Sequence, residues 1–146
     1  GRKPFKLIIV GNGALEDALK EKIRANGLEQ EVTLYENVPY PDMWKIYCMS
    51  DYYVNMNKGE IFGMAIMEAV YYCTSVAAYW AIGPSVTLKG MKGHALCRDD
   101  DAIAQWLLAP YPAREDLEES AEKIARDFSW RRCAGAFLEI VEKNVK

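Results

Sequence analysis

The chain has 146 residues and a formal net charge of −3, with 51% hydrophobic and 27% charged residues. These values are typical of one soluble globular domain that buries a sizeable core. The negative balance argues against sequence-independent nucleic-acid binding, which needs a basic surface, and no apolar run reaches the roughly 20 residues that span a bilayer.

The four cysteines are widely spaced, with neither a C-x-x-C pair nor a Cys/His spacing. This pattern argues against a zinc site, so we expect no metal ion. In a chain of this size it favours reduced thiols, and therefore a cytoplasmic location.

The first half of the chain alternates short apolar strands with helices. In order, the predicted elements are a strand at 5–10, a helix at 14–25, a strand at 32–35, a turn at 38–41, a short helix at 42–49, a strand at 51–56 and a helix at 62–72. Asn26-Gly27 is a favourable C-cap for the first helix. The first strand begins almost directly at the start, so we expect the chain to be cut from a longer protein.

The second half is predicted to become more helical toward its end. In order, the expected elements are a strand at 75–79, a loop at Gly83-Pro84-Ser85, weak strands at 86–88 and 94–97, a helix at 99–108, and a helical segment at 114–146 that is interrupted at 128–130. The helix at 99–108 begins with acids, as the helix dipole favours. Ser129 is the expected N-cap after the interruption.

Alternating strands and helices predict βαβ units and a parallel sheet with helices on both faces, an α/β Rossmann-like fold. Ligands of such sheets bind beyond the carboxyl ends of the strands, near helix N-termini. Gly11, Gly13 and Glu60 each follow a predicted strand. We therefore expect these three residues at the same edge of the sheet.

Gly11-x-Gly13 permits either a close approach to a ligand or a plain tight turn. The third glycine of a dinucleotide fingerprint is absent, since Glu16 stands there, and only Glu36 lies near the end of the second strand. These features disfavour a nicotinamide site, and the chain has no phosphate-binding P-loop motif.

The run at 59–69 places Glu60 and Glu68 around an uncharged stretch with one glycine, Gly63. One interpretation is a buried helix, with residues 61–67 largely in the core, whose flanking acids lie at the dipole end and at the rim. The other is a sugar-nucleotide site. Backbone N–H groups near Gly63 would then bind phosphate, and the carboxylates would accept hydrogen bonds from sugar and ribose hydroxyls.

Three further groups carry a structural and a functional interpretation each. His94 is a strand-end residue or a general base, and we favour the former. The run Asp99-Asp100-Asp101 is a helix start or a cation site, and again we favour the former. Lys89 and Lys92 are solvated loop residues or phosphate contacts.

The ordered set of motifs resembles the C-terminal, donor-binding domain of GT-B glycosyltransferases, specifically glycosyltransferase family 4, the group 1 enzymes. The matching segments are residues 7–13, Asn26-Gly27-Leu28, Ser50-Asp51, the E-x7-E run with Phe62-Gly63-Met64, Gly83-Pro84-Ser85 and Asp127-Phe128-Ser129-Trp130. The resemblance covers nearly the whole chain. It implies that residues 1–146 form a single domain, the nucleotide-sugar-binding half of a larger two-domain enzyme.

The resemblance implies retaining transfer of a sugar from a UDP- or GDP-sugar to an acceptor hydroxyl, in glycan or cell-surface polysaccharide synthesis, with no cofactor and no obligatory metal. It implies that Glu60 is catalytic and that Glu68 binds the ribose diol. The remaining implied substrate-binding residues are Gly11 and Gly13 at the cleft, Val38 near the base, and the backbone of Phe62, Gly63 and Met64.

The chain departs from the family pattern at several positions. Met56-Asn57, Ile61, Cys73-Thr74-Ser75 and Val86 replace, respectively, a proline-serine pair, a glycine, a glycine-x-proline segment and an acid. The arginine and lysine that grip the diphosphate, and the acceptor-binding N-terminal domain, would lie upstream. We therefore expect the isolated chain to be inactive, with any membrane contact made through the missing domain.

Two alternatives remain. One is a catalytically silent nucleotide-binding or protein-docking domain that kept the fold. The other is a different enzyme class with a Rossmann-like half, such as a sugar-nucleotide epimerase.

Overall fold

A computed structural model describes residues 4–144 and divides the chain into two compact units, Gly1–Met43 and Trp44–Lys146. Strands and helices alternate in both, and every paired strand runs parallel to its neighbour. Within the described residues, no helix combines the length and the apolar character needed to cross a membrane.

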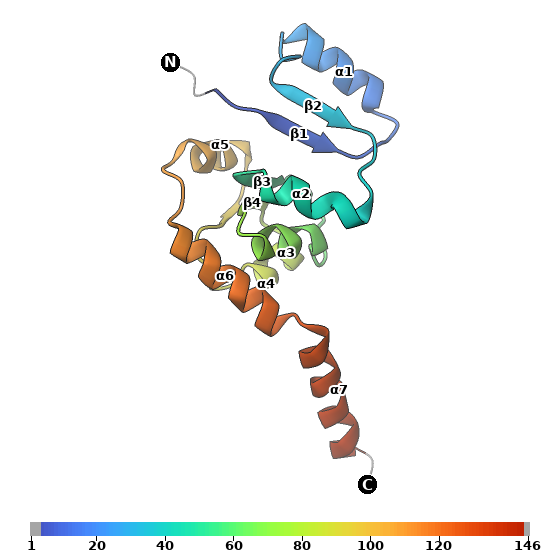
Figure 1. Cartoon of the computed structure of the whole chain (residues 1–146), viewed down its shortest axis with the longest axis vertical. Helices are drawn as coiled ribbons and strands as arrows, with labels where there is room; N and C mark the ends of the chain where they lie inside the picture. Colours follow the sequence, from blue (N-terminus) through green and yellow to red (C-terminus); the bar gives the residue numbers. More distant parts are fainter. Residues whose placement is uncertain (1–3, 145–146) are drawn as a thin grey trace. The chain divides into compact units, whose positions relative to one another are not determined.

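The first unit is a single βαβ element, drawn in blue in Figure 1. Strands β1 (Leu7–Val10) and β2 (Val32–Tyr35) pair in parallel from Leu7↔Val32 to Val10↔Tyr35. Helix α1 (Glu16–Ala25) connects them. It ends as predicted at Asn26 and Gly27, where Gly27 has a φ of +63° and its N–H donates to the Arg24 carbonyl. The 3-10 turn η1 (Tyr40–Asp42) closes the unit.

The second unit contains a three-stranded parallel sheet in the order β3-β4-β5. Its strands are β3 (Tyr52–Asn55), β4 (Ser75–Tyr79) and β5 (Ala95–Cys97). All of β4 is buried, as expected of a central strand covered on both faces. The helices of the unit are α2 (Met43–Cys48), α3 (Met64–Tyr71), α4 (Ile82–Thr87), α5 (Asp100–Leu108), α6 (Arg114–Asp127) and α7 (Trp130–Asn144).

The two faces of this sheet can be assigned from side-chain alternation along the strands. Ala77 and Tyr79 of β4 form a core cluster with Ile103 of α5, and Val54 of β3 packs against it. Tyr53 and Asn55, the alternate residues of β3, pair with Val76 and Ala78 and therefore belong to the opposite face. The two faces of the sheet are thus packed separately, and Tyr53 and Asn55 share the one away from α5.

The prediction for residues 83–88 was wrong, because residues 83–87 belong to helix α4 and Leu88 is its C-cap, so the segment forms neither a loop nor a strand. Pro84 is the third residue of this helix, where a missing N–H removes no helical hydrogen bond. Gly83, Pro84, Thr87 and Leu88 are buried, a spacing that follows the helical and not the strand period. The Thr87 hydroxyl donates to the Gly83 carbonyl at 3.1 Å, as helical Thr residues often do.

The predicted interruption of the C-terminal helical segment is confirmed between α6 and α7. The Arg132 N–H donates to Ser129 Oγ at 3.3 Å, which is the expected N-cap contact. Helix α6 buries Leu117, Ser120, Ala121 and Ile124. Residues 145–146 of the predicted helix lie outside the described part of the chain.

Candidate functional site

Glu60 lies in the turn that joins the carboxyl end of β3 to the start of α3. Its Oε1 accepts a hydrogen bond of 3.0 Å from the N–H of Gly63, the N-cap of α3. Gly63 has a φ of +84°, and a Cβ there would lie 3.0 Å from Ile66 Cδ1, so the position favours glycine on both grounds. The acid is therefore fixed at the positive end of the α3 dipole.

Two asparagine amides reach the other oxygen of the same carboxylate. The Nδ2 atoms of Asn55 and Asn57 each lie 3.4 Å from Glu60 Oε2. Their own oxygens are also used, since Asn55 Oδ1 accepts from the Asn57 N–H at 2.9 Å and Asn57 Oδ1 accepts from the Gly59 N–H at 3.0 Å. These side-chain-to-backbone contacts shape the turn that carries Glu60.

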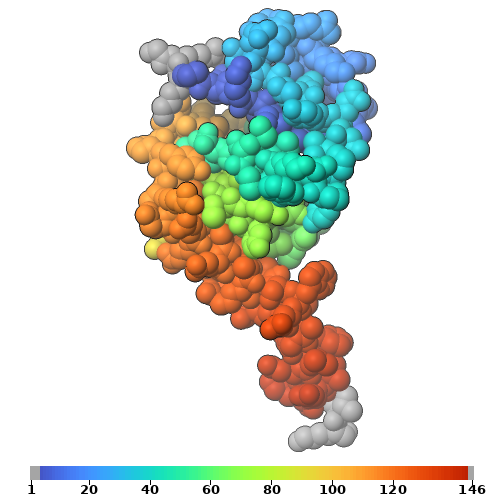
Figure 2. Space-filling view, in the orientation of Figure 1, coloured from blue at the N-terminus to red at the C-terminus, as the bar shows by residue number. Residues whose placement is uncertain are grey.

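Glu68, on the second turn of α3, is half-buried and is held by a tyrosine hydroxyl. Tyr47 of α2 donates its hydroxyl proton to Glu68 Oε2 at 3.0 Å. Figure 2 shows α2, in teal, beside α3, in green, on the visible face of the second unit.

Tyr53 links the surroundings of the two acids. Burial raises the pKa of its hydroxyl, a hydrogen bond with the Asn55 side chain lowers it, and the negative charges of Glu60 and Glu68 raise it further. Both carboxylates thus act on one tyrosine of β3. Glu60 lies just before α3 and Glu68 on its second turn, on the two sides of the same short segment.

The expectation that residues 61–67 are largely buried was wrong for the first part of the run. Ile61 is 82% exposed, and Phe62 and Met64 are 49% and 57% exposed. The reason is that these residues belong to the turn and first helical residue at the sheet edge, whereas the core-facing side of α3 begins at Ile66. An apolar but accessible surface therefore lies next to Glu60 and Gly63.

The candidate residues of the first unit follow its strands. The Gly11 N–H donates to the Tyr35 carbonyl at 2.9 Å, and the Gly13 carbonyl accepts from the Glu16 N–H at 3.1 Å. Both glycines are exposed, and a Cβ on either would meet no atom within 4 Å. Val38 is half-buried in the segment after β2. These residues belong to the first unit and both acids to the second, so their meeting at one edge stays a prediction.

His94 fits the structural interpretation. Its Nδ1 accepts a hydrogen bond of 3.1 Å from the Val76 N–H, so it ties the start of β5 to β4. Burial lowers the pKa of its imidazole from 6.5 to about 4. A neutral ring whose nitrogen already accepts from the backbone is a poor candidate for a general base at neutral pH.

Asp99 also has a structural role, because its Oδ1 accepts from the Ala102 N–H at 2.8 Å and caps α5. Asp100 accepts a hydrogen bond from the Tyr79 hydroxyl. In the described part of the chain, no group of three or more His, Cys, Asp or Glu side chains could hold a metal ion.

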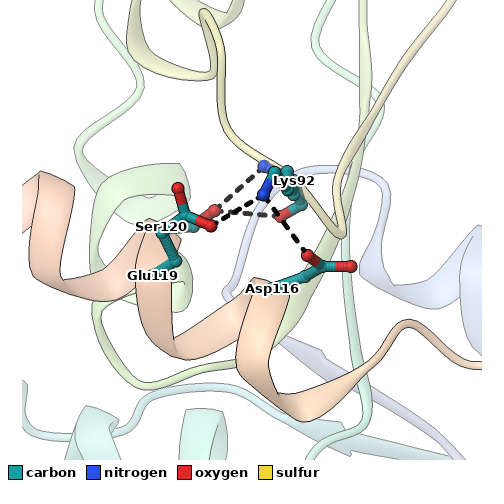
Figure 3. A network of polar contacts seen from close by, with 4 residues as sticks. All are labelled: Lys92, Asp116, Glu119 and Ser120. Carbon is teal, nitrogen blue, oxygen red and sulfur yellow. Dashed lines mark hydrogen bonds and ion pairs between the residues drawn. The ribbon is translucent and has the colours of Figure 1, made fainter.

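Lys92 is engaged in a polar network with α6, drawn in Figure 3. Its Nζ lies 2.9 Å from Glu119 and 3.9 Å from Asp116. Its backbone N–H donates to Ser120 Oγ, and that hydroxyl donates to the Lys92 carbonyl, both at 3.0 Å. These contacts anchor the segment before β5 and make Lys92 a structural residue.

A shallow pocket of about 450 Å³ lies at the end of α4, along α6 and the start of α7. Lys89, Lys123 and Arg132 contribute cations to its lining, and Asp127 lies 3.5 Å from Lys123 and 3.9 Å from Arg132. Neither Glu60 nor Glu68 lines it. We therefore place the candidate site at the acids, where several polar groups converge, and not at this pocket.

Residues 2–124 match the family described as glycosyl transferases group 1. The chain belongs to this family. No match is found among curated protein sequences.

The chain is similar in fold to several glycosyltransferases of known structure. A glycosyltransferase from Rickettsia africae ESF-5 aligns with a TM-score of 0.81 and 22% identity, over 97% of this chain and 40% of that one. Sucrose-phosphate synthase from Thermosynechococcus elongatus aligns with a TM-score of 0.77 and 20% identity, over 94% and 38%. The pneumococcal O-GlcNAc transferase GtfA, solved with UDP and GlcNAc, aligns with a TM-score of 0.56 and 19% identity, over 87% and 23%.

These similarities confirm the expected α/β fold of the Rossmann-like, GT-B type. The chain spans 40% or less of the length of each of these three proteins.

Sequence reasoning missed three residues of the site: Asn55, Asn57 and Tyr47. In the sequence, Asn57 stands out only as a departure from the family pattern, and Tyr47 lies unremarked within the short helix predicted at 42–49. A usable signal was present for the asparagines, since an Asn-x-Asn pair at the end of a strand and just before an acid suits a turn that positions that acid. Tyr47 gave no comparable signal, because its partner lies 21 residues away.

Proposed function

We propose that this chain is the donor-binding half of a retaining glycosyltransferase of family 4, which transfers a sugar from a UDP- or GDP-sugar to an acceptor hydroxyl. The observation that carries the proposal is the placement of two carboxylates around one helix, Glu60 before α3 and Glu68 on its second turn, each held by hydrogen bonds from neighbouring side chains or backbone. Family membership over residues 2–124 supports the same reaction class.

In this proposal Glu60 accepts hydrogen bonds from hydroxyls of the donor sugar. Its negative charge stabilises the positive charge that develops at the anomeric carbon as the bond to the diphosphate breaks, which is electrostatic stabilisation by a pre-positioned group. The Gly63 N–H and the two amides hold the carboxylate in place, so little reorganisation accompanies the reaction.

The proposed roles of the remaining residues follow from their places. The backbone of Phe62, Gly63 and Met64 lies at the positive end of α3 and contacts the donor sugar and its phosphates. Glu68, on the second turn of α3, accepts hydrogen bonds from the vicinal hydroxyls of the ribose. Gly11, Gly13 and Val38 line the cleft and the base pocket on the first unit.

The partner domain belongs to this proposal as well. It supplies the acceptor site, the cations for the diphosphate and any contact with a membrane, while the parent enzyme works in the cytoplasm in glycan or cell-surface polysaccharide synthesis. The isolated chain then binds the donor weakly and transfers nothing, because half of the cleft is absent.

Calorimetric titration of the isolated chain with UDP-glucose and GDP-mannose tests the binding half of this proposal. We expect weak, saturable binding of at least one nucleotide sugar, and loss of that binding in Glu68→Gln. Absence of binding to both sugars in the full-length protein would overturn the proposal, and transfer by the isolated chain would overturn its dependence on a second domain.

One observation favours the alternative of a silent domain. Ile61, which stands where the resemblance has a glycine, is 82% exposed directly after Glu60, so a β-branched side chain borders the proposed catalytic acid. This alternative predicts that the full-length protein binds nucleotide but shows no turnover with any donor. Restoring glycine in Ile61→Gly would then leave turnover absent.

A further inference from the structure

We propose that Tyr47 is a positioning residue that holds the Glu68 carboxylate ready for a ribose diol, and that it thereby sets a preference for ribonucleoside over 2′-deoxyribonucleoside diphosphates. This inference rests on the function proposed above and names a residue that the family resemblance does not assign.

The contact itself is direct and joins two helices. The Tyr47 hydroxyl of α2 lies 3.0 Å from Glu68 Oε2 of α3. The tyrosine is only 4% exposed, whereas Glu68 is half-buried. A hydrogen bond to a charged partner is stronger than an average one, and its removal takes one fixed donor away from a partly buried carboxylate.

The Tyr47 ring is itself held by aromatic packing and by its backbone. The Tyr72 ring stacks on it, with centroids 6.0 Å apart and planes 11° from parallel. The Tyr53 ring meets it edge-on at 5.9 Å and 70°. The buried Thr74 hydroxyl donates to the Tyr47 carbonyl at 2.9 Å. The hydroxyl of Tyr47 is therefore a fixed point rather than a mobile surface group.

A fixed donor confers order on its acceptor. A glutamate side chain loses rotamer entropy when it is immobilised by a ligand, and a carboxylate oxygen can accept more than one hydrogen bond. Because Tyr47 already orients Glu68, a ribose diol binds to a carboxylate that is ordered before the ligand arrives. Pre-organisation of this kind raises affinity specifically for the ligand groups that the ordered residue contacts. The 2′-hydroxyl is such a group, and a 2′-deoxyribose lacks it.

The experiment compares UDP with 2′-deoxy-UDP, and GDP with 2′-deoxy-GDP, by calorimetry on the full-length protein. The variants are Tyr47→Phe, Glu68→Gln, the double variant, and Tyr71→Phe as a matched control. Tyr71 lies on α3 and, like Tyr47, packs against the Tyr72 ring, but it is 51% exposed. Thermal unfolding of each variant reports any loss of stability.

For the wild type we expect the ribonucleotide to bind more tightly than its deoxy form. Tyr47→Phe should weaken the ribonucleotide about tenfold and the deoxynucleotide much less, so that the ratio of their affinities falls. The double variant should be no worse than Glu68→Gln alone, and Tyr71→Phe should keep the wild-type ratio. A Tyr47→Phe variant that weakens both nucleotides equally, or neither, would overturn the inference.

Glu68→Asp provides a second route if Tyr47→Phe does not fold. It keeps the charge but withdraws the carboxylate from Tyr47 by one methylene, and we expect the same loss of ribose preference. In one outcome Glu68→Gln removes the wild-type preference for the ribonucleotide, while Tyr47→Phe and Glu68→Asp both keep it. That outcome contradicts only the role of Tyr47. Absence of any nucleotide binding by the wild type contradicts the proposed function itself.

Discussion

The N–H of Gly83 donates a hydrogen bond of 3.1 Å to the carbonyl of Glu60. Helix α4 therefore supports the turn that contains this acid. A Cβ on Gly83 would lie 2.6 Å from the Ile61 carbonyl carbon and 2.6 Å from the Phe62 nitrogen. Both atoms belong to the backbone and cannot move aside as a flexible side chain would. Glycine at 83 is thus required by the close approach of two chain segments, one of which presents the candidate catalytic residue.

Gly83→Ala should therefore displace the turn at 60–63. We expect a loss of about 1–3 kcal/mol in the free energy of unfolding, as in other overpacked sites. In the full-length protein we expect a fall in kcat of roughly tenfold or more, because misplacement of a reacting group by about 1 Å has effects of up to a hundredfold. Urea unfolding and steady-state kinetics measure the two effects.

Gly135→Ala is the matched control for this prediction. Gly135 lies inside α7, and a Cβ there would meet no atom within 4 Å. The same substitution should stabilise that helix by about 0.5–1 kcal/mol and leave kcat unchanged. If Gly83→Ala behaves like Gly135→Ala, the support of Glu60 by α4 is refuted.

The sequence pattern was sufficient to predict most of the fold, and the misprediction at α4 has a clear reason. The bounds of β2 and β4 agree with the strands predicted at 32–35 and 75–79, because their apolar runs are short and end at sharp composition changes. Gly83-Pro84-Ser85 is a common loop signal. In this chain it forms the first turn of a helix, where a proline is tolerated and a glycine is needed for contact with another segment.

The site was predictable only in part, for a related reason. Glu60 and Glu68 are close in sequence, one before α3 and one on its second turn, so the sequence could name both as candidates beside their structural interpretation. The groups that hold them belong to other elements, since Tyr47 comes from α2 and Asn55 from the end of β3. Such contacts depend on which face of β3 meets α3, and the pairing of β3 with β4 settles that face.

The two acids should differ in the kinetic constant that they affect in the full-length protein. Glu60→Gln removes a charge that acts on the transition state, so kcat should fall by a factor of about 100 or more with a small change in KM. Glu68→Gln removes a contact with the nucleotide, so the KM for the donor should rise about tenfold with a smaller change in kcat. Steady-state kinetics with varied donor measures both. Wild-type kinetics in both variants would exclude the proposed roles.

Asn57 gives a more selective test of how Glu60 is positioned. Asn57 is exposed, and its Oδ1 accepts from the Gly59 N–H while its Nδ2 lies near Glu60 Oε2. Asn57→Ala should lower kcat about three- to tenfold and change the unfolding free energy by less than about 1 kcal/mol, since the contact at 3.4 Å is long for a hydrogen bond. Asn57→Asp, which keeps the acceptor for Gly59 but places a second negative charge beside Glu60, should lower kcat further. Equal activity of Asn57→Ala and wild type would show that the turn does not need this amide.

His94 should make the stability of the fold depend on pH, independently of the acids Glu60 and Glu68. Burial lowers the pKa of His94 from 6.5 to about 4, so the unfolded chain binds a proton at pH values where the folded chain does not. Stability should therefore be lost as the pH falls from about 6.5 toward 4, and this histidine should contribute no pH dependence above about 7. The full effect is on the order of 3 kcal/mol, of which about 2 kcal/mol falls between pH 7 and pH 5. Urea unfolding at pH 7 and pH 5 measures this change against His94→Gln, whose amide oxygen can still accept from the Val76 N–H.

The glutamine variant should lose less stability between the two pH values than the wild type, because the carboxylates contribute equally to both proteins and only the wild type has a ring to protonate. An equal loss in the two proteins would mean that His94 is as readily protonated in the folded chain as in the unfolded one.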